Sequence, residues 1–331
     1  MRKSHAPRMI AQHITIWWLG MFALSVSAQS EWTDKSPHKS GFVTVNGVRL
    51  HYLDWGGKGE AMLFLHGIGD TPHIYDVLAP KFTNQFRVLG LTRRGHGESK
   101  IPDDGYDTAT RVEDIRQFLD ALNIPRAILV GHSAAGGEVT MFAGKHPDRA
   151  IKIVYLDAVF DTDRRLELLR RMPAEMTPPE AAESLDSVRR WQKRMNNGWS
   201  EAWEATLRVH FSPDGNAFLN QERRSRALGM MLEPGAEAQQ DFTKIKSRAL
   251  NITVVGFPSN MVNYFKALPE PRRKSIDEFF SSVNRVKEKE TERFRKELPG
   301  ARVVAFTNAD HHCFIDREDD VVREMRAFLG K

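Results

Sequence analysis

The chain has 331 residues, of which 41% are hydrophobic and 27% charged, as is usual for a globular protein with a sizeable core. Its formal net charge is +5, and the first 28 residues contribute three basic side chains and no acid. Without them the net charge is +2, so composition gives no reason to expect a nucleic-acid partner. The single cysteine, Cys313, excludes an intramolecular disulfide.

The first 28 residues have the three parts of a secretory signal peptide. A basic start precedes an apolar run over residues 14–24, and small residues lead up to Ala28. An uncleaved membrane anchor is the alternative, but the run is short for a span of roughly 20 residues. We therefore expect cleavage after Ala28, a periplasmic or secreted protein, and no stable membrane span afterwards. We interpret residues 29–39 as a flexible lead-in.

The first ordered element predicted is a β-hairpin. Asn46-Gly47 separates two runs with alternating apolar and polar residues, 42–45 and 48–53. Both turn positions need positive φ, which Asn-Gly provides, and we expect this hairpin at an antiparallel edge of a larger sheet. Short apolar runs downstream predict buried parallel strands; they are residues 61–65, 88–91, 127–130, 151–156, 251–256 and 302–306.

Residues 111–122 have apolar side chains at helical spacing, and strands that alternate with helices predict a mostly parallel sheet. Residues 158–250 break this alternation because they are charged, helical in character and contain several tryptophans. We interpret them as a helical cap that shapes a substrate pocket; the alternative is a peripheral helical subdomain. The predicted domains are a signal peptide (1–28), a core in two parts (29–157 and 251–331) and the cap (158–250).

Two further helices are predicted over residues 275–298 and 319–329. The first contains the mixed-charge run Lys287-Glu288-Lys289-Glu290, which we interpret as a solvated surface with charge pairs and not as a binding site.

The most informative motif follows the strand at 127–130 and reads Gly131-His132-Ser133-Ala134-Ala135-Gly136. It resembles the nucleophile elbow G-x-S-x-G, with alanine in place of the last glycine. A serine between a strand and a helix projects its hydroxyl outward, and the free N–H groups of the helix start point to the same place. Ser133 is therefore the predicted nucleophile. Glu138 is an unusual acid in this apolar helix start, suited to the positive end of the helix dipole.

Candidate oxyanion donors come from two loops. The strand at 61–65 leads directly into His66-Gly67-Ile68-Gly69, whose glycines permit close approach of the backbone. We expect the N–H groups of Ile68 and of Ala134, the residue after the nucleophile, to converge on one oxygen. A plain turn at the end of a strand is the alternative.

A nucleophilic serine needs a base, and two adjacent histidines, His311 and His312, follow the last predicted strand. We prefer His311 and keep His312 as the alternative. Neighbours in sequence rarely bind one ion together. The chain also has no H-E-x-x-H motif and no cysteine cluster, so we predict no metal site.

The histidine needs a carboxylate to hold its tautomer. The loop 257–260 after the strand at 251–256 contains no acid. Asp157, at the end of the strand 151–156, is therefore assigned this role, with Asp161 and Asp163 as weaker candidates. A structural helix cap is the alternative for Asp157.

Residues 42–329 resemble an α/β-hydrolase-fold protein. The resemblance is carried by five motifs in the order of that fold; they are HGIG at 66–69, TRRGHGES at 92–99, GHSAAG at 131–136, YLDA at 155–158 and ADH at 309–311. It implies a mostly parallel central sheet flanked by helices, a helical cap inserted before the penultimate strand, and a Ser-His-acid triad without a cofactor. The missing acid after Gly256 departs from the commonest pattern of the family.

The expected function is an exported serine hydrolase that cleaves a small carboxylic ester through an acyl-enzyme. Many activities share this frame. The alternatives are a cofactor-free perhydrolase or an amidase or peptidase on the same triad, and a non-catalytic protein that binds a small ligand. Serine at the elbow disfavours dehalogenases and epoxide hydrolases, which carry aspartate there. The sequence does not predict the oligomeric state.

Overall fold

The structure is a computed structural model that describes residues 33–160, 164, 167–168, 170–173, 184–195, 199–233, 235–256 and 263–330. The expected signal peptide and the alternative acids Asp161 and Asp163 lie outside the described residues. Residues 36–331 form the unit described below. Every helix of the described residues is too short or too polar to cross a membrane.

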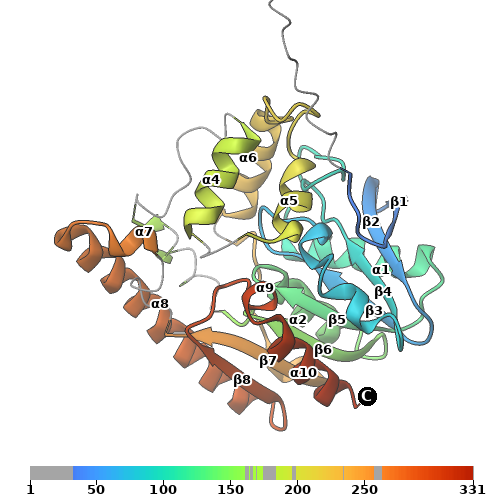
Figure 1. Cartoon of the computed structure of the whole chain (residues 1–331). Coiled ribbons are helices and arrows are strands. Elements are labelled where there is room, and N and C mark those ends of the chain that lie inside the picture. The colour runs from blue at the N-terminus through green and yellow to red at the C-terminus, as the bar shows by residue number, and fades with distance from the viewer. Residues whose placement is uncertain are drawn as a thin grey trace, which may run out of the picture. The chain divides into compact units, whose positions relative to one another are not determined.

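The described part of the chain forms an eight-stranded sheet in the order β1-β2-β4-β3-β5-β6-β7-β8 (Figure 1). The strands are β1 (Lys39–Val45), β2 (Val48–Gly56), β3 (Ala61–Leu65), β4 (Arg87–Leu91), β5 (Ala127–His132), β6 (Ala150–Leu156), β7 (Arg248–Val255) and β8 (Arg302–Thr307). The predicted hairpin, β1 and β2, lies antiparallel at one edge, and from β4 to β8 all neighbouring strands are parallel. Asn46 and Gly47 have φ values of +49° and +72°, as their turn requires.

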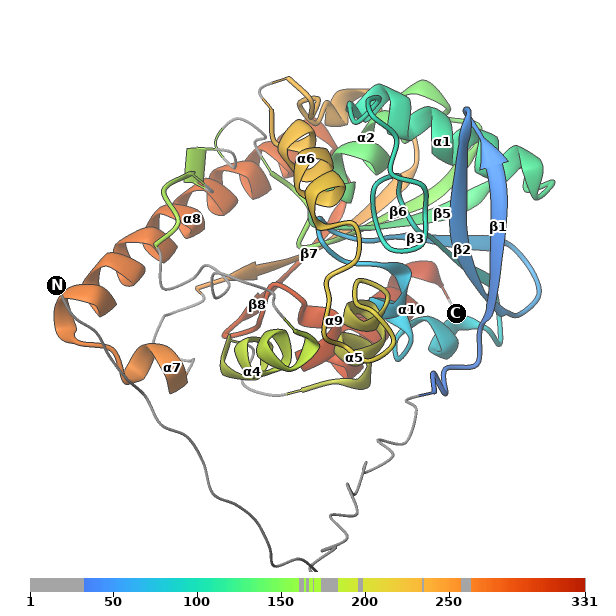
Figure 2. The same ribbon diagram turned by 90° about the horizontal axis from the view of Figure 1, so that it is seen from above.

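Helices cover both faces of the sheet (Figure 2). One face packs against α1 (Thr108–Ala121), α2 (Ala135–Lys145) and the C-terminal end of α8 (Glu270–Glu297). The other packs against η1 (Pro72–Tyr75), η2 (Ala79–Phe82), α9 (Cys313–Asp316) and α10 (Glu318–Leu329). Successive residues of a strand enter opposite layers: in β3, Leu63 and Leu65 join the first core, and Met62 and Phe64 the second. This explains why the central strands are apolar throughout.

The insertion between β6 and β7 lies where the sequence predicts it, before the penultimate strand. Its described elements are α4 (Leu185–Met195), α5 (Glu201–Arg208), α6 (Gln221–Met231) and η4 (Phe242–Lys244), and α7 (Asn263–Lys266) follows β7. Helix α5 packs on η1, where the Thr71 N–H donates to the Thr206 hydroxyl over 2.9 Å. Residues 248–250, predicted in the cap, belong to β7.

The structure corrects the interpretation of residues 29–39 as a flexible lead-in at its C-terminal end, His38 and Lys39, while residues 29–32 lie outside the described residues. Lys39 already belongs to β1, and the His38 imidazole forms a hydrogen bond 3.1 Å long with the Asp76 carboxylate. The sequence of this segment shows no apolar alternation until residue 42, so its ordered residues are held by pairing with β2 and by this polar contact.

Two buried ion pairs stabilise the loop after β4. The Arg94 guanidinium donates two hydrogen bonds of 2.7 Å to Asp114 of α1. Arg93 lies 2.6 Å and Arg111 3.0 Å from the same oxygen of Glu138 in α2. Glu138 is therefore a buried partner of two arginines, a role that the helix-dipole interpretation did not include.

Candidate active site

Ser133 lies on a sharp turn between β5 and α2. Its φ is +51°, in the left-handed region that side chains rarely adopt, and such strain is typical of functional turns. The Ser133 N–H donates to the Leu156 carbonyl of β6 over 3.3 Å, and the Ser133 carbonyl accepts from the Gly136 N–H over 2.9 Å. These bonds hold the turn against the neighbouring strand.

The glycine that this turn needs is Gly136 and not residue 135. A Cβ atom at Gly136 would collide with the carbonyl oxygen of Ala158, whereas Ala135 is accommodated in the core. The shift of the last motif glycine by one position is therefore explained by the close approach of α2 to the end of β6.

The loop after β3 lies directly against the elbow. A Cβ atom at Gly67 would be 3.1 Å from Cβ of Ser133 and 3.0 Å from Nδ1 of His132. Ile68, the next residue, lines the same cavity as Ser133. Ala134 is the buried N-cap residue of α2, adjacent to Ser133 but outside the cavity lining. Both predicted oxyanion donors thus lie on segments that border the Ser133 turn.

Asp157 and His311 are in direct contact. Nδ1 of His311, on the loop after β8, lies 2.6 Å from Oδ2 of Asp157 at the end of β6. The other oxygen, Oδ1, accepts from the Val254 N–H over 2.9 Å, which fixes the carboxylate on β7. Asp157 is 2% exposed, whereas the His311 side chain is 41% exposed and lines the Ser133 cavity. An imidazole held by Nδ1 in this way has its Nε2 available for proton transfer.

Lys287 of α8 shares this carboxylate, which corrects the prediction of a solvated surface. Its Nζ lies 2.6 Å from Oδ2 of Asp157 and 3.2 Å from the Val254 carbonyl. Lys287 and Glu290 are buried, and only Glu288 and Lys289 are exposed as predicted.

These contacts change the pKa of the Asp157 carboxyl. Burial alone would raise the pKa of its carboxyl, but the Lys287 ammonium and the His311 hydrogen bond outweigh burial and hold that pKa well below its ordinary value. The carboxylate therefore stays ionised. Sequence reasoning missed Lys287 as a residue of the site. Glu290, Thr291 and Phe294 follow it at helical spacing on the same face, and this spacing was the available sign that Lys287 shares a packed face with Phe294.

His312 makes different contacts from His311. Its Nε2 lies 3.2 Å from Asp70, on the loop after β3, and its Nδ1 lies 3.5 Å from Asp310. Burial opposes its charge, but these two carboxylates outweigh burial and raise the pKa of His312 to about 10. An imidazole that is protonated at neutral pH is unsuited to act as a base there. The structure thus brings His311, and not His312, to Asp157.

The cavity at Ser133 has a volume of about 590 Å³. Apolar side chains of the insertion and of α8 form much of its wall; they are Phe160, Leu168, Trp191, Leu228, Leu232, Phe279, Phe280 and Val283. Its polar lining includes Ser133, Lys287 and His311, together with Gln192, Asn284, Asp310 and His312. A largely apolar wall with a few polar groups is typical of sites for small molecules.

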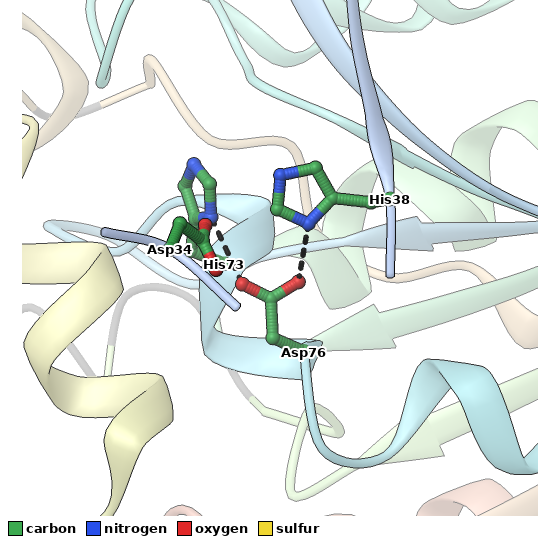
Figure 3. Close-up of side chains that lie close together, drawn as sticks. All are labelled: Asp34, His38, His73 and Asp76. Carbon is green, nitrogen blue, oxygen red and sulfur yellow. Dashed lines mark hydrogen bonds and ion pairs between the residues drawn. The ribbon is translucent and has the colours of Figure 1, made fainter. Parts of the chain in front are cut away.

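Two groups of described side chains have metal-ligand chemistry, and in each the ligand atoms lie within 4.8 Å of one another. One is Asp70, His132 and His312 beside the elbow. The other includes His38, His73 and Asp76 (Figure 3). Asp76 accepts hydrogen bonds from both of these imidazoles, over 3.1 and 2.9 Å, and from the Trp55 indole over 2.9 Å. These contacts form a hydrogen-bonded network around the Asp76 carboxylate.

Comparison with known proteins gives a consistent result. A family model described as alpha/beta hydrolase fold matches residues 60–318. The chain is 26% identical over 258 residues to 2-(acetamidomethylene)succinate hydrolase of Mesorhizobium japonicum, covering 77% of this chain and 83% of that protein. It is 35% identical over 123 residues to a bifunctional esterase/perhydrolase of Acinetobacter calcoaceticus, covering 36% of this chain and 45% of that protein.

Other curated relatives, 33% identical over 125 residues, are matched over only 36% of their length. Among solved structures, E-2-(acetamidomethylene)succinate hydrolase is similar with a TM-score of 0.68 at 20% identity, covering 89% of this chain and 100% of that chain.

Proposed function

The chain belongs to the α/β-hydrolase-fold family, and on this basis we propose that it is a serine hydrolase that cleaves carboxylic esters. Ser133 is the nucleophile, His311 the base and Asp157 the acid that holds the histidine. The observation that carries the proposal is the 2.6 Å contact of His311 Nδ1 with Asp157, on a cavity that Ser133 and His311 line together.

The reaction proceeds in two halves. Nε2 of His311 takes the proton of the Ser133 hydroxyl as its oxygen attacks the ester carbonyl, and the N–H groups of Ile68 and Ala134 stabilise the oxyanion. The tetrahedral intermediate collapses, and the leaving alcohol receives the proton from His311. Water, deprotonated by His311, then attacks the acyl-enzyme and releases the acid, which regenerates the Ser133 hydroxyl.

The apolar wall supports an ester with an apolar acyl or alcohol group. The insertion contributes much of that wall, and we assign it the role of a cap that selects the substrate. An ester is the simplest substrate for this triad, because an alcohol leaves more readily than an amine. The names of the two relatives support hydrolysis, and one of them also supports perhydrolysis as a second candidate.

The test is hydrolysis of p-nitrophenyl esters from acetate to octanoate by the full chain and by the chain that starts at Gln29. Ser133→Ala, His311→Ala and Asp157→Asn each should lower kcat/KM by about 10³-fold or more. Ester turnover that survives Ser133→Ala would exclude the proposed nucleophile. Absence of turnover together with activity on acetate and peroxide would favour the perhydrolase, and ligand binding without any turnover would favour a binding protein.

We also propose that the protein is exported, and the support for this is the signal-peptide pattern of residues 1–28. Expression of the full chain in a bacterium, followed by fractionation and N-terminal sequencing, tests it. A periplasmic protein that begins at Gln29 is expected, and a cytoplasmic protein that retains residues 1–28 would contradict the proposal.

A further inference from the structure

A second, smaller cavity lies beside the one that contains Ser133. Its volume is about 290 Å³, and it shares Trp191, Gln192 and Leu228 with the larger cavity. Most of its wall is apolar and comes from the insertion, with Phe211, Phe218 and Met231 among the contributors. Gly69 of the loop after β3 also reaches it. The two cavities therefore lie side by side and share part of their lining.

Two polar side chains in this apolar wall have unused hydrogen-bonding capacity. His210 is 7% exposed, and neither of its ring nitrogens has a hydrogen-bond partner of good geometry, although the Gly69 backbone is near enough to favour its protonated form. Burial, reinforced by Arg224, nevertheless lowers the pKa of His210 to about 3. The ring is neutral at pH 7 and has one N–H donor, for which the Gly69 backbone and a ligand are alternative acceptors.

Arg224 of α6 is held in a fixed orientation. Its Nε donates to the Leu219 carbonyl over 3.0 Å and one Nη2 hydrogen to the Gly97 carbonyl over 2.7 Å. Nη1 is shielded from solvent and has no partner. Among the described residues no carboxylate pairs with this guanidinium, and burial lowers the pKa of Arg224. A partly buried cation without a counter-charge is costly, so this position favours an anion from outside.

The apolar wall of the smaller cavity and the uncompensated charge of Arg224 together indicate the chemistry of its ligand. A guanidinium with one free nitrogen and a neutral imidazole match a carboxylate, which accepts charge-assisted hydrogen bonds from both. The apolar wall requires that this carboxylate be carried on a hydrocarbon chain or ring. Arg224 and His210 line the smaller cavity and Ser133 the larger, so a carboxylate held by the first two would lie away from the reacting carbonyl.

We propose that this second cavity is a carboxylate-binding subsite, and that the natural substrates are half-esters or related acyl compounds with an anionic end remote from the bond that is cleaved. This inference rests on the proposed ester hydrolysis. Arg224 and His210 act as specificity-determining residues that contact the substrate and take no part in bond cleavage.

The test compares two p-nitrophenyl ester series of equal length. One carries a terminal carboxylate, as in mono-p-nitrophenyl adipate, suberate and sebacate, and the other carries the corresponding methyl ester. For at least one length, kcat/KM should be about tenfold or more higher for the anionic substrate. Arg224→Met and His210→Phe should reduce that ratio toward one, and Arg224→Lys should restore part of it. Arg226→Met is the matched control, because Arg226 lies exposed on the same helix and pairs with Asp103.

A binding experiment separates this inference from the proposed reaction. Suberate should bind the Ser133→Ala variant in calorimetry, and Arg224→Met added to that variant should weaken binding by about tenfold. If no ester is hydrolysed but suberate binds in an Arg224-dependent manner, the reaction is wrong and the subsite stands. If neutral and anionic esters react equally, or if Arg224→Met leaves both the ratio and the binding unaltered, the subsite is wrong.

Discussion

Nζ of Lys287 and Nδ1 of His311 lie on the same oxygen, Oδ2 of Asp157, each at 2.6 Å. The proposed catalytic acid thus has the Lys287 ammonium as its second partner, delivered by a helix 130 residues away in sequence. Without that cation, hydrogen bonds such as those from His311 and from the Val254 N–H would be left to offset the effect of burial on the carboxylate.

Lys287→Met should raise the pKa of the Asp157 carboxyl, because the Lys287 ammonium no longer offsets the effect of burial. The acid limb of the kcat/KM profile should move to higher pH, and the free energy of unfolding should fall by about 1–3 kcal/mol. Lys289→Met, on the exposed side of the same helix, is the control. Superimposable pH profiles for the two variants would show that Lys287 does not support Asp157.

Substitution of the two adjacent histidines should have very different effects on kcat. His311→Gln removes the proposed base and should lower kcat by about 10³-fold or more, whereas His312→Gln removes a structural cation and should cost far less. Equal losses in the two variants would contradict the distinction.

His312 should also make stability depend on pH on the alkaline side. Its pKa in the folded protein is raised from 6.5 to about 10, so its stabilisation is complete below pH 6.5 and disappears as the pH rises through 10. Urea denaturation at pH 6, 8 and 10 should show a stability difference between the protein and His312→Gln that shrinks over this range. A difference that stays constant would exclude the ion pair with Asp70 as its source.

Two neighbouring glycines of α2 should respond in opposite ways to alanine. Gly136→Ala forces a Cβ atom into the Ala158 carbonyl and should destabilise the fold by several kcal/mol, of the order seen for overpacked cores. At Gly137 the nearest atom to an added Cβ is 3.8 Å away, so Gly137→Ala should be neutral or stabilising by up to about 1 kcal/mol. Thermal unfolding of both variants measures the contrast.

Asp76 should contribute to acid sensitivity. Burial opposes its ionisation, but the hydrogen bonds from His38 and His73 outweigh burial and lower the pKa of Asp76 from 3.8 to about 2. Its stabilisation, about 2 kcal/mol, is therefore present above pH 3.8 and is lost as the pH falls through 2. Urea midpoints of the protein and of Asp76→Asn, compared at pH 7 and pH 2.5, should converge at the lower pH.

Local patterns were sufficient for the framework of the fold. The Asn46-Gly47 turn, the apolar strand runs and the order of the motifs depend on short stretches of chain, and the structure has each of them. The choice of Asp157 also rested on a local fact, the lack of an acid in residues 257–260. Its contact with His311 follows from strand order, because the ends of parallel strands meet at one edge of the sheet.

Contacts that depend on three-dimensional packing could not be predicted from local sequence patterns. Lys287 stands in a run of alternating charges, and only its place on the helical face that packs on β7 turns it inward. Glu138 was noticed as unusual, but its partners come from two other segments, the loop after β4 and α1. The ordered His38 likewise depends on Asp76 and Trp55, which no spacing rule connects to it.

The position of Asp157 has a consequence for how this chain can diversify. Ser133 and Asp157 end two adjacent strands, β5 and β6, and both precede the insertion. A recombination point between residues 158 and 287 leaves that pair together on one side, and the incoming sequence must then supply the histidine and the lysine. If the insertion selects the substrate as proposed, chimeras that exchange it between relatives should change the substrate range while keeping the proposed nucleophile.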